Sequence, residues 1–199
     1  MSVRIYVEGG FQGSTKSDCR TAFRLFLEKA IAPKSFRVIA SGSRNDAFAD
    51  FCQALKHHPG DYIILLVDSE EPVTTDPWQH LWNRTGDNWQ RPTTAGEDQA
   101  HLMVQVMESW FLADKQTLAD YYGQGFLVGS LPGQLKIEFL SKQDVFNGLH
   151  HASRKTQKGE YHKTRHGFDL LALINPKRVR AASPHAERLF AVLERETAA

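Results

Sequence analysis

The sequence predicts an α/β fold: a mainly parallel sheet flanked by helices, followed by a mostly helical C-terminal extension. Short strand-like runs alternate with longer segments of helical periodicity over the first half of the chain. Such alternation is typical of βαβ units, in which successive strands are parallel. The run at residues 62–67 is apolar without a break, as expected of a central strand covered on both faces.

Each element follows from its local pattern. Helices are expected where apolar side chains recur at spacings of three and four, and strands where short apolar runs end at glycine, proline or polar residues. The expected strands span residues 3–7, 36–40, 62–67 and 101–105. The expected helices span residues 16–30, 45–57, 107–114, 142–153, 166–173 and 184–196. A single continuous helix over residues 97–122 is an alternative to the fourth strand and the helix that follows it.

Two regions of unequal size are expected. Residues 1–113 form the α/β core, with a long loop at 69–98 whose proline, glycine and tryptophan content is typical of a functional excursion. Residues 114–199 form a helical extension that packs on this core and carries a basic segment. The total length of 199 residues suits one compact domain with a modest appendage.

Composition excludes several classes of protein. Hydrophobic residues make up 41% of the chain and charged residues 24%, which excludes a disordered or low-complexity chain. No run approaches the roughly 20 consecutive apolar residues of a membrane-spanning helix, so no membrane partner is expected. The N-terminus leads directly into a strand, unlike a signal peptide, and two cysteines, Cys19 and Cys52, are too few for a disulfide framework. We therefore expect a cytoplasmic protein.

The net charge of +1 hides an uneven distribution. Residues 151–180 contain eight Lys and Arg against two acidic residues, a local charge of +6 that leaves −5 for the rest of the chain. An acidic body beside a basic segment fits a metal site next to a polyanion. A solvated charged surface explains the same distribution equally well.

Carboxylates follow the expected strands at informative positions. Glu8 ends the first strand, Asp68 and Glu70 end the central one, and Glu108 opens the helix after the fourth. Ligands of open α/β sheets bind beyond the carboxyl ends of the strands, and clustered acids repel each other unless a cation is present. The sequence therefore predicts a site for Mg²⁺ or Mn²⁺, although the same acids also suit helix caps and loops.

These residues resemble a known domain. A strand followed by Glu-Gly, two βα units, and a strand followed by Asp-x-Asp/Glu is the layout of the Toprim domain of topoisomerases, primases and the nuclease domains of overcoming-lysogenization-defect proteins. More narrowly, the chain is similar to the bacterial family of unknown function numbered 4276, which resembles Toprim-like proteins of phage defence. The narrower resemblance is carried by VEGG at 7–10, LVDSE at 66–70, PWQHL at 77–81, HLMVQ at 101–105, MESWFL at 107–112 and KGEYHK at 158–163.

The resemblance implies roles for individual residues. Glu8 matches the Toprim glutamate, a general acid/base or metal ligand, and Asp68 and Glu70 match the metal-binding pair, with glutamate where a second aspartate is commoner. Glu108 matches a further acid of the nuclease branch, whose accompanying serine is absent here. That branch also uses a lysine to stabilise the charge of the transition state. Lys158 and Lys163 are the candidates for this role.

The basic segment at 154–166 is the second candidate site. Lys and Arg neutralise phosphates, tyrosine stacks on bases, and glycine admits a close backbone approach. The candidate phosphate- or nucleic-acid-binding residues are Gly9, Gly10, Arg154, Lys155, Lys158, Tyr161, His162, Lys163 and His166. His162 and His166 stand four apart, but without an H-E-x-x-H motif solvated or capping roles are favoured over a metal site.

A phosphate-binding loop of the Walker type is disfavoured. Residues 10–17 follow a strand and open a helix, but Thr15 stands where the motif needs glycine. An anion-binding site at the start of this helix remains an alternative, because free N–H groups and the helix dipole favour an anion there.

Together these features predict a metal-dependent phosphodiesterase, a Toprim-like nuclease that acts on DNA or RNA. By its resemblance, it would act in phage defence with a separately encoded ATPase. The alternative is a non-catalytic regulatory subunit that binds nucleic acid or nucleotide. A phosphohydrolase of small molecules is a third interpretation. The sequence leaves the oligomeric state open.

Overall fold

The computed structural model describes residues 2–10, 14–32 and 35–198. The described residues form a four-stranded sheet of order β2-β1-β3-β4, in which every pairing is parallel. Its strands are β1 (Val3–Glu8), β2 (Phe36–Gly42), β3 (Tyr62–Asp68) and β4 (Ala100–Met103). The predicted α/β fold with a parallel sheet and a helical C-terminal part is confirmed.

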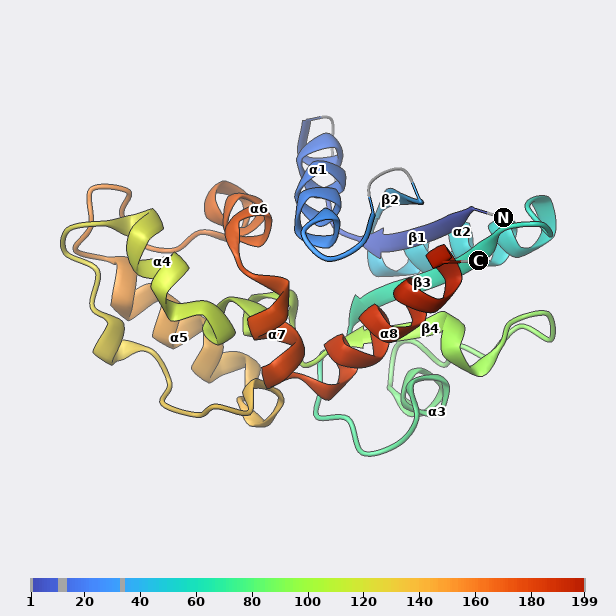
Figure 1. Ribbon diagram of the computed structural model, residues 1–199. Coiled ribbons are helices and arrows are strands. Elements are labelled where there is room, and N and C mark those ends of the chain that lie inside the picture. The colour runs from blue at the N-terminus through green and yellow to red at the C-terminus, as the bar shows by residue number, and fades with distance from the viewer. Residues whose placement is uncertain (1, 11–13, 33–34, 199) are drawn as a thin grey trace.

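Helices cover both faces of the sheet (Figure 1). The side chains of Ile5, Ile64 and Leu66 join one core with α1 (Ser14–Glu28) and α8 (Pro184–Ala198). Tyr6, Leu65 and their neighbours on the other face join a second core with α2 (Arg44–His57) and α3 (Pro77–Asn83). Burial on both sides explains why β3 is apolar throughout, since each such side chain contributes about 1.5–3 kcal/mol to folding.

The second half of the chain is helical. It contains α4 (Lys115–Tyr122), α5 (Lys142–Ser153), α6 (Lys163–Leu173) and α7 (Pro176–Ala182), and α8 then returns to cover β4 and β1. The strands point their carboxyl ends toward α4–α7, which extend to one side of the sheet (Figure 1). Helix α6 packs against α1, and Lys29 Nζ caps its C-terminal end by donating to the carbonyls of Ala172, Leu173 and Ile174 at 2.7–2.8 Å.

Several sequence expectations need correction. The continuous helix at 97–122 is wrong, because β4 interrupts it and because residues 107–114 form a 3₁₀ helix (Met107–Asp114) instead of an α-helix. The expected loop at 69–98 contains α3, which begins at the N-cap Asp76 followed by Pro77. Helices α4 and α7 were not predicted. With seven or eight residues each, α3, α4 and α7 are too short to show a clear periodicity.

Three short 3₁₀ helices complete the chain, at Glu97–Gln99, Val128–Ser130 and Ile137–Phe139. Within the described ranges, no helix is both long and apolar enough to cross a membrane.

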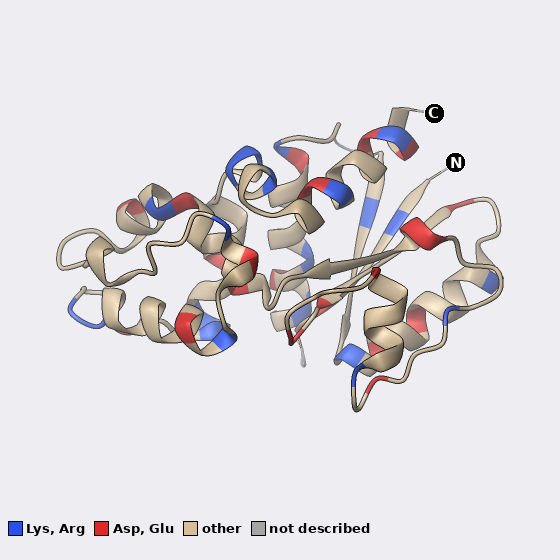
Figure 2. Cartoon of the chain, turned by 90° about the horizontal axis from the view of Figure 1, so that it is seen from below, with Lys and Arg blue, Asp and Glu red and all other residues tan. Residues whose placement is uncertain are grey.

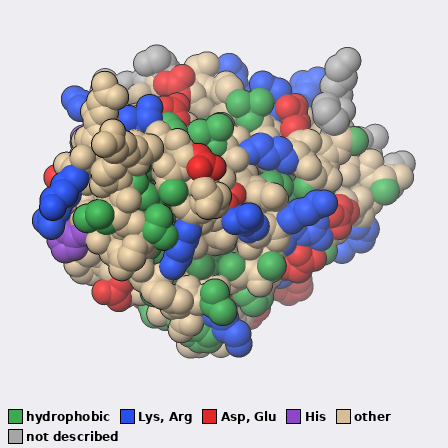
Figure 3. Space-filling view, turned by 60° about the vertical axis from the view of Figure 1, so that its left-hand side comes forward, with side chains coloured by type: hydrophobic (Ala, Val, Ile, Leu, Met, Phe, Trp, Pro, Cys, Tyr) green, Lys and Arg blue, Asp and Glu red, His purple; other side chains and the backbone are tan. Residues whose placement is uncertain are grey.

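Charges are mixed over the molecule. Both basic and acidic residues are scattered over the sheet half and the helical half of the molecule (Figure 2). On the face drawn in Figure 3, basic side chains lie in several separate groups with hydrophobic and acidic side chains between them.

Candidate metal centre

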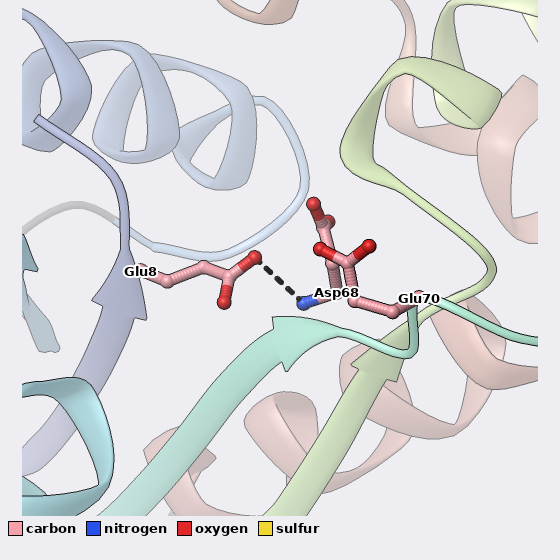
Figure 4. Close-up of side chains that lie close together, drawn as sticks. All are labelled: Glu8, Asp68 and Glu70. Atoms are coloured by element: carbon pink, nitrogen blue, oxygen red, sulfur yellow. Dashed lines mark hydrogen bonds between the residues drawn. The ribbon is translucent and has the colours of Figure 1, made fainter. Parts of the chain in front are cut away.

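Three of the four predicted acids come together at one edge of the sheet. Glu8 ends β1, Asp68 ends β3, and Glu70 follows two residues later, so that one carboxylate oxygen from each lies within 4.8 Å of the others (Figure 4). Strands β1 and β3 are parallel neighbours, with Val7 opposite Leu66, so their carboxyl ends lie side by side. The arrangement is one that a divalent cation could fill with oxygen ligands.

Backbone contacts hold these acids in place. The N–H of Asp68 donates to Glu8 Oε1 at 3.2 Å, and the N–H of Met107 donates to Asp68 Oδ1 at 2.7 Å. Glu70 has a positive φ of 64°, a conformation that non-glycine residues rarely adopt, and its N–H donates to the carbonyl of Gln105 at 2.8 Å. This bend turns Glu70 back toward Asp68 (Figure 4).

Asp68 is the buried acid of the cluster. Its side chain is almost fully buried, and burial together with the negative charge of Glu8 raises its pKa well above the ordinary value. Glu108 adds to this increase, and Lys163 opposes it. A buried carboxylate beside like charges favours a bound cation, which removes the repulsion.

Three cationic side chains surround the acids. Arg44 NH1 lies 3.3 Å from Glu8 Oε2, Lys142 Nζ pairs with Glu70 Oε2, and Lys163 Nζ lies 4.0 Å from Asp68 Oδ2. Burial opposes the charge of Lys163, but Glu108 and Asp68, helped by Glu8 and Glu70, raise its pKa above the usual value. Lys163 is therefore charged at neutral pH, at the N-terminal end of α6.

Arg44 is held by a second set of contacts. Its Nε and NH2 donate to the two oxygens of Asp87 at 2.8 and 2.7 Å, and its guanidinium lies 4.9 Å from the ring centre of Trp89. Arg44 NH1 also donates to the backbone carbonyl of Asp68. Sequence reasoning missed Arg44, Asp87 and Lys142, because isolated charged residues far apart in the chain carry no motif.

Glu108 lies beside the three acids but outside their group. Its side chain is fully buried; Tyr161 donates to Oε1 at 3.0 Å, and Lys163 Nζ lies 3.7 Å from the same oxygen. The second oxygen, Oε2, finds no hydrogen-bond donor among the residues that the structure describes. Lys163 therefore links Glu108 to Asp68.

Four candidate residues of the basic segment lie on the surface. Arg154, Lys155, Lys158 and His162 are exposed, and Lys158 Nζ lies over the ring of Tyr121 at 4.7 Å. Of the predicted nucleic-acid contacts in this segment, Lys163 is the one that reaches the metal centre.

Tyr161 and His166 lie inside the protein. Tyr161 is 3% exposed, because its ring packs in the core, so the stacking on a base that the sequence suggested is not available to it in this conformation. His166 Nδ1 lies 3.1 Å from the hydroxyl of Tyr122 and accepts the N–H of His162 at 3.2 Å. The contact between the two histidines is thus a hydrogen bond from the backbone of His162 to the ring of His166. It does not arrange the two rings as a pair of metal ligands.

A pocket of about 400 Å³ adjoins the carboxylates. Charged side chains of the centre form part of its lining, and apolar side chains and glycines form most of the rest. Gly10 has a φ of 72°, and a Cβ there would lie 2.6 Å from the carbonyl oxygen of Thr15, so only glycine fits at this position. The lining residues are Glu8, Gly9, Gly10, Thr15, Gly42, Arg44, Asp68, Glu70, Met103, Met107, Lys163, Thr164 and Phe168.

Comparison with known proteins gives a family and no activity. A family model, DUF4276, a domain of unknown function, matches residues 13–194. The match includes Asp68, Glu70, Glu108 and Lys163, whereas Glu8 precedes it. No curated protein and no solved structure matches the chain. Because the match covers most of its length, the chain belongs to the DUF4276 family.

Proposed function

We propose that this protein is a metal-dependent phosphodiesterase that acts on nucleic acid. The observation that supports this most directly is the convergence of Glu8, Asp68 and Glu70 at the carboxyl edge of β1 and β3. The layout is the one that the Toprim resemblance implies, with the acids on the first and third strands. A lysine, Lys163, stands beside them with its charge directed at Asp68.

The donor set fits a hard divalent cation. Every candidate ligand is a carboxylate oxygen, the type that Mg²⁺ and Mn²⁺ prefer, and neither cysteine nor histidine belongs to the group. Glu108 Oε2, which is buried without a donor among the described residues, supports an additional positive charge nearby. Glu8, Asp68 and Glu70 would hold the ion, with Glu108 behind Asp68.

The ion pairs of the cluster are compatible with this proposal. Lys142 and Glu70 are partly exposed, and an exposed pair contributes only about 0–1 kcal/mol, so a metal ion readily replaces Lys142. Asp87 holds Arg44 in place, and Arg44 contacts Oε2 of Glu8. The other oxygen of Glu8, Oε1, accepts the N–H of Asp68 and faces the site. Arg44 therefore orients Glu8.

The chemistry divides between the ion and the chain. When bound, Mg²⁺ or Mn²⁺ supplies an activated water and stabilises the oxygen that leaves phosphorus. Lys163 would neutralise charge on the phosphate, and Glu8 would serve as a metal ligand or as the general acid/base that the Toprim resemblance implies. Arg154, Lys155 and Lys158 are exposed and available to the phosphates of a longer strand. The action in phage defence, an ATPase partner and a cytoplasmic location are parts of the proposal that rest on the resemblance and the composition.

The test is cleavage of labelled single-stranded and duplex DNA and RNA with Mg²⁺, Mn²⁺ or excess EDTA. Asp68→Asn keeps the acceptor for the N–H of Met107 but removes the charge, and we expect it to lower the cleavage rate at least about a hundredfold. Asp120→Asn, at an exposed acid of α4, is the matched control and should keep full activity. Cleavage that survives EDTA, or an active Asp68→Asn variant, would refute the proposal.

A second candidate function is a non-catalytic nucleic-acid-binding subunit. The observation that favours it is that Glu8, Glu70 and Asp68 each already have a cation within 4 Å: Arg44, Lys142 and Lys163. These three ion pairs reduce the negative charge of the cluster without a metal. Nucleic-acid binding that is unchanged by EDTA, with no cleavage of any substrate, would favour this candidate.

A further inference from the structure

The pocket beside the carboxylates has two chemically different sides. Glu8, Asp68, Glu70, Arg44 and Lys163 give it a charged side. Met103, Met107 and Phe168 give it an apolar side, and they come from the end of β4, the following 3₁₀ helix and α6. Metal-binding carboxylates alone do not require such an apolar surface. The surface therefore indicates a second recognition element, for a part of the substrate that is not charged.

The position of the apolar side follows from the fold. Met103 is the β4 partner of Asp68, so its side chain begins at the same sheet edge as the acid. The ring of Phe168 reaches over the backbone of Gly9, where an added Cβ would lie 3.6 Å from its Cζ. The apolar groups thus lie beside the residues that end β1 and β3, within one residue of Glu8 and opposite Asp68.

We propose that the pocket binds one unpaired nucleoside of the substrate, and that its phosphate faces Lys163 and the metal centre. The inference rests on the proposed function and specifies its substrate. Bases stack well on an aromatic ring, and Phe168 is the partly exposed aromatic side chain of the lining, whereas Met103 and Met107 are almost fully buried beneath it. The volume of about 400 Å³ lies in the range of small-ligand pockets, about 300–1,000 Å³, and suits one nucleoside.

A single-nucleoside pocket restricts the substrate. A base inside a duplex is stacked and paired, and it reaches a pocket only when it is extruded or unpaired. The enzyme is therefore specific for strand ends, single strands and small nucleotide diesters, and it disfavours the interior of a duplex. The same pocket accepts a free nucleoside monophosphate as a ligand.

The first experiment compares two diesters that share a leaving group. Thymidine 5′-monophosphate p-nitrophenyl ester carries a nucleoside, and bis(p-nitrophenyl) phosphate does not. We expect Phe168→Leu, which removes the ring but keeps an apolar side chain, to lower kcat/KM for the thymidine ester about tenfold more than for the second diester. Trp82→Ala, at an exposed tryptophan of α3, is the control and should change neither value.

The outcomes separate this inference from the proposed function. An equal loss of kcat/KM on both diesters, or no loss on either, overturns the nucleoside pocket. Hydrolysis of either diester by the wild type still supports the proposed phosphodiesterase. If the wild type hydrolyses neither diester and cleaves neither DNA nor RNA, the proposed function fails. Calorimetric titration of thymidine 5′-monophosphate with and without Mg²⁺ then tests the inference alone. Binding that weakens about tenfold in Phe168→Leu supports the pocket, and absence of binding to the wild type overturns it.

Discussion

Glu8 Oε1 accepts a hydrogen bond from the backbone N–H of Asp68 at 3.2 Å, although the two residues lie 60 positions apart. The contact joins the ends of β1 and β3 and leaves two carboxylates facing one space (Figure 4). Glu8 thus acts both as a structural acceptor and as a candidate ligand. The candidate centre is built into the edge of the sheet and does not depend on a mobile loop for its first two acids.

Metal ions should stabilise the folded protein through this centre. Binding to the folded state alone adds about 2.7 kcal/mol at a metal concentration of a hundred times Kd, which raises Tm by about 5–10 °C for a chain of this size. We expect this increase with Mg²⁺ or Mn²⁺, and none in Asp68→Asn. Differential scanning fluorimetry with and without EDTA measures it.

The metal-free Asp68→Asn variant should be more stable than the metal-free wild type. Burial and the charge of Glu8 raise the pKa of Asp68, so ionisation at neutral pH costs folding free energy, and asparagine removes that cost. We expect Tm to rise by about 2–4 °C. Asp120→Asn is the control for both measurements. A lower Tm for metal-free Asp68→Asn would mean that Lys163 and the hydrogen bonds outweigh the repulsion.

The pair of Arg44 and Asp87 should be important for stability. The side chain of Asp87 is 1% exposed and accepts from both Arg44 and Arg84, so Asp87→Ala leaves two guanidinium groups without their partner. Breaking a buried pair in this way costs about 3–5 kcal/mol. We expect a loss of that size in the free energy of unfolding measured with urea.

The same segment offers a matched control. Glu97 pairs with Arg91, but both side chains are exposed, so Glu97→Gln should cost less than about 1 kcal/mol. If Asp87→Ala costs no more than Glu97→Gln, Asp87 is not what holds Arg44 in place. A double-mutant cycle with Arg44→Met then measures the coupling between Arg44 and Asp87 directly.

The sequence predicts the ends of β1 and β3 well because two simple rules determine them. An apolar run ends at a charged residue, and parallel neighbours end at the same edge, so Glu8 and Asp68 have to meet once the strand order is correct. Glu70 joins them through a bend at its own positive φ of 64°, which its spacing of two residues from Asp68 does not predict. The strand 101–105 is displaced from Ala100–Met103 by one or two residues, a typical error for a short strand.

The rest of the site depends on tertiary contacts. Ser43 and Asp46 form a capping box that predicts where α2 begins, but no local rule directs Arg44 toward Asp87. Tyr161 reads as an exposed aromatic residue of a basic segment, yet α6 and the 3₁₀ helix Met107–Asp114 enclose it against Glu108. Burial of a residue with charged neighbours is decided by packing between distant elements, which a single sequence does not show.

The hydroxyl of Tyr161 should stabilise the fold by hydrogen bonding to Glu108. Tyr161→Phe would leave the buried carboxylate without its hydroxyl donor, at a cost of about 1–3 kcal/mol in unfolding free energy. Tyr121→Phe is the matched control, because its hydroxyl donates to the exposed Asp169, and it should cost less than about 1 kcal/mol. Equal effects of the two variants, measured by urea unfolding, would contradict a special role for the contact with Glu108.

His101 should make stability dependent on pH. The ring is buried; Nε2 lies 2.9 Å from the carbonyl of Asp98, and Nδ1 lies 3.2 Å from Arg188 NH1. The neutral tautomer with a proton on Nε2 satisfies both contacts, donating to Asp98 and accepting from Arg188. Burial and the charge of Arg188 lower the pKa of His101 to about 3.

The sign follows from which state binds the proton. Between about pH 6.5, the unfolded value, and the folded value of about 3, the unfolded chain takes up a proton that the folded chain refuses. Stability therefore falls as pH decreases through this window, by at most about 1.4 kcal/mol per pH unit from this residue. His101→Asn keeps an acceptor for Arg188 and does not titrate. The slope of unfolding free energy against pH should therefore be smaller in this variant by up to about 1.4 kcal/mol per pH unit, the contribution of one proton. Identical slopes for the two proteins between about pH 6.5 and pH 5 would show that His101 is protonated, or exposed, in the folded state.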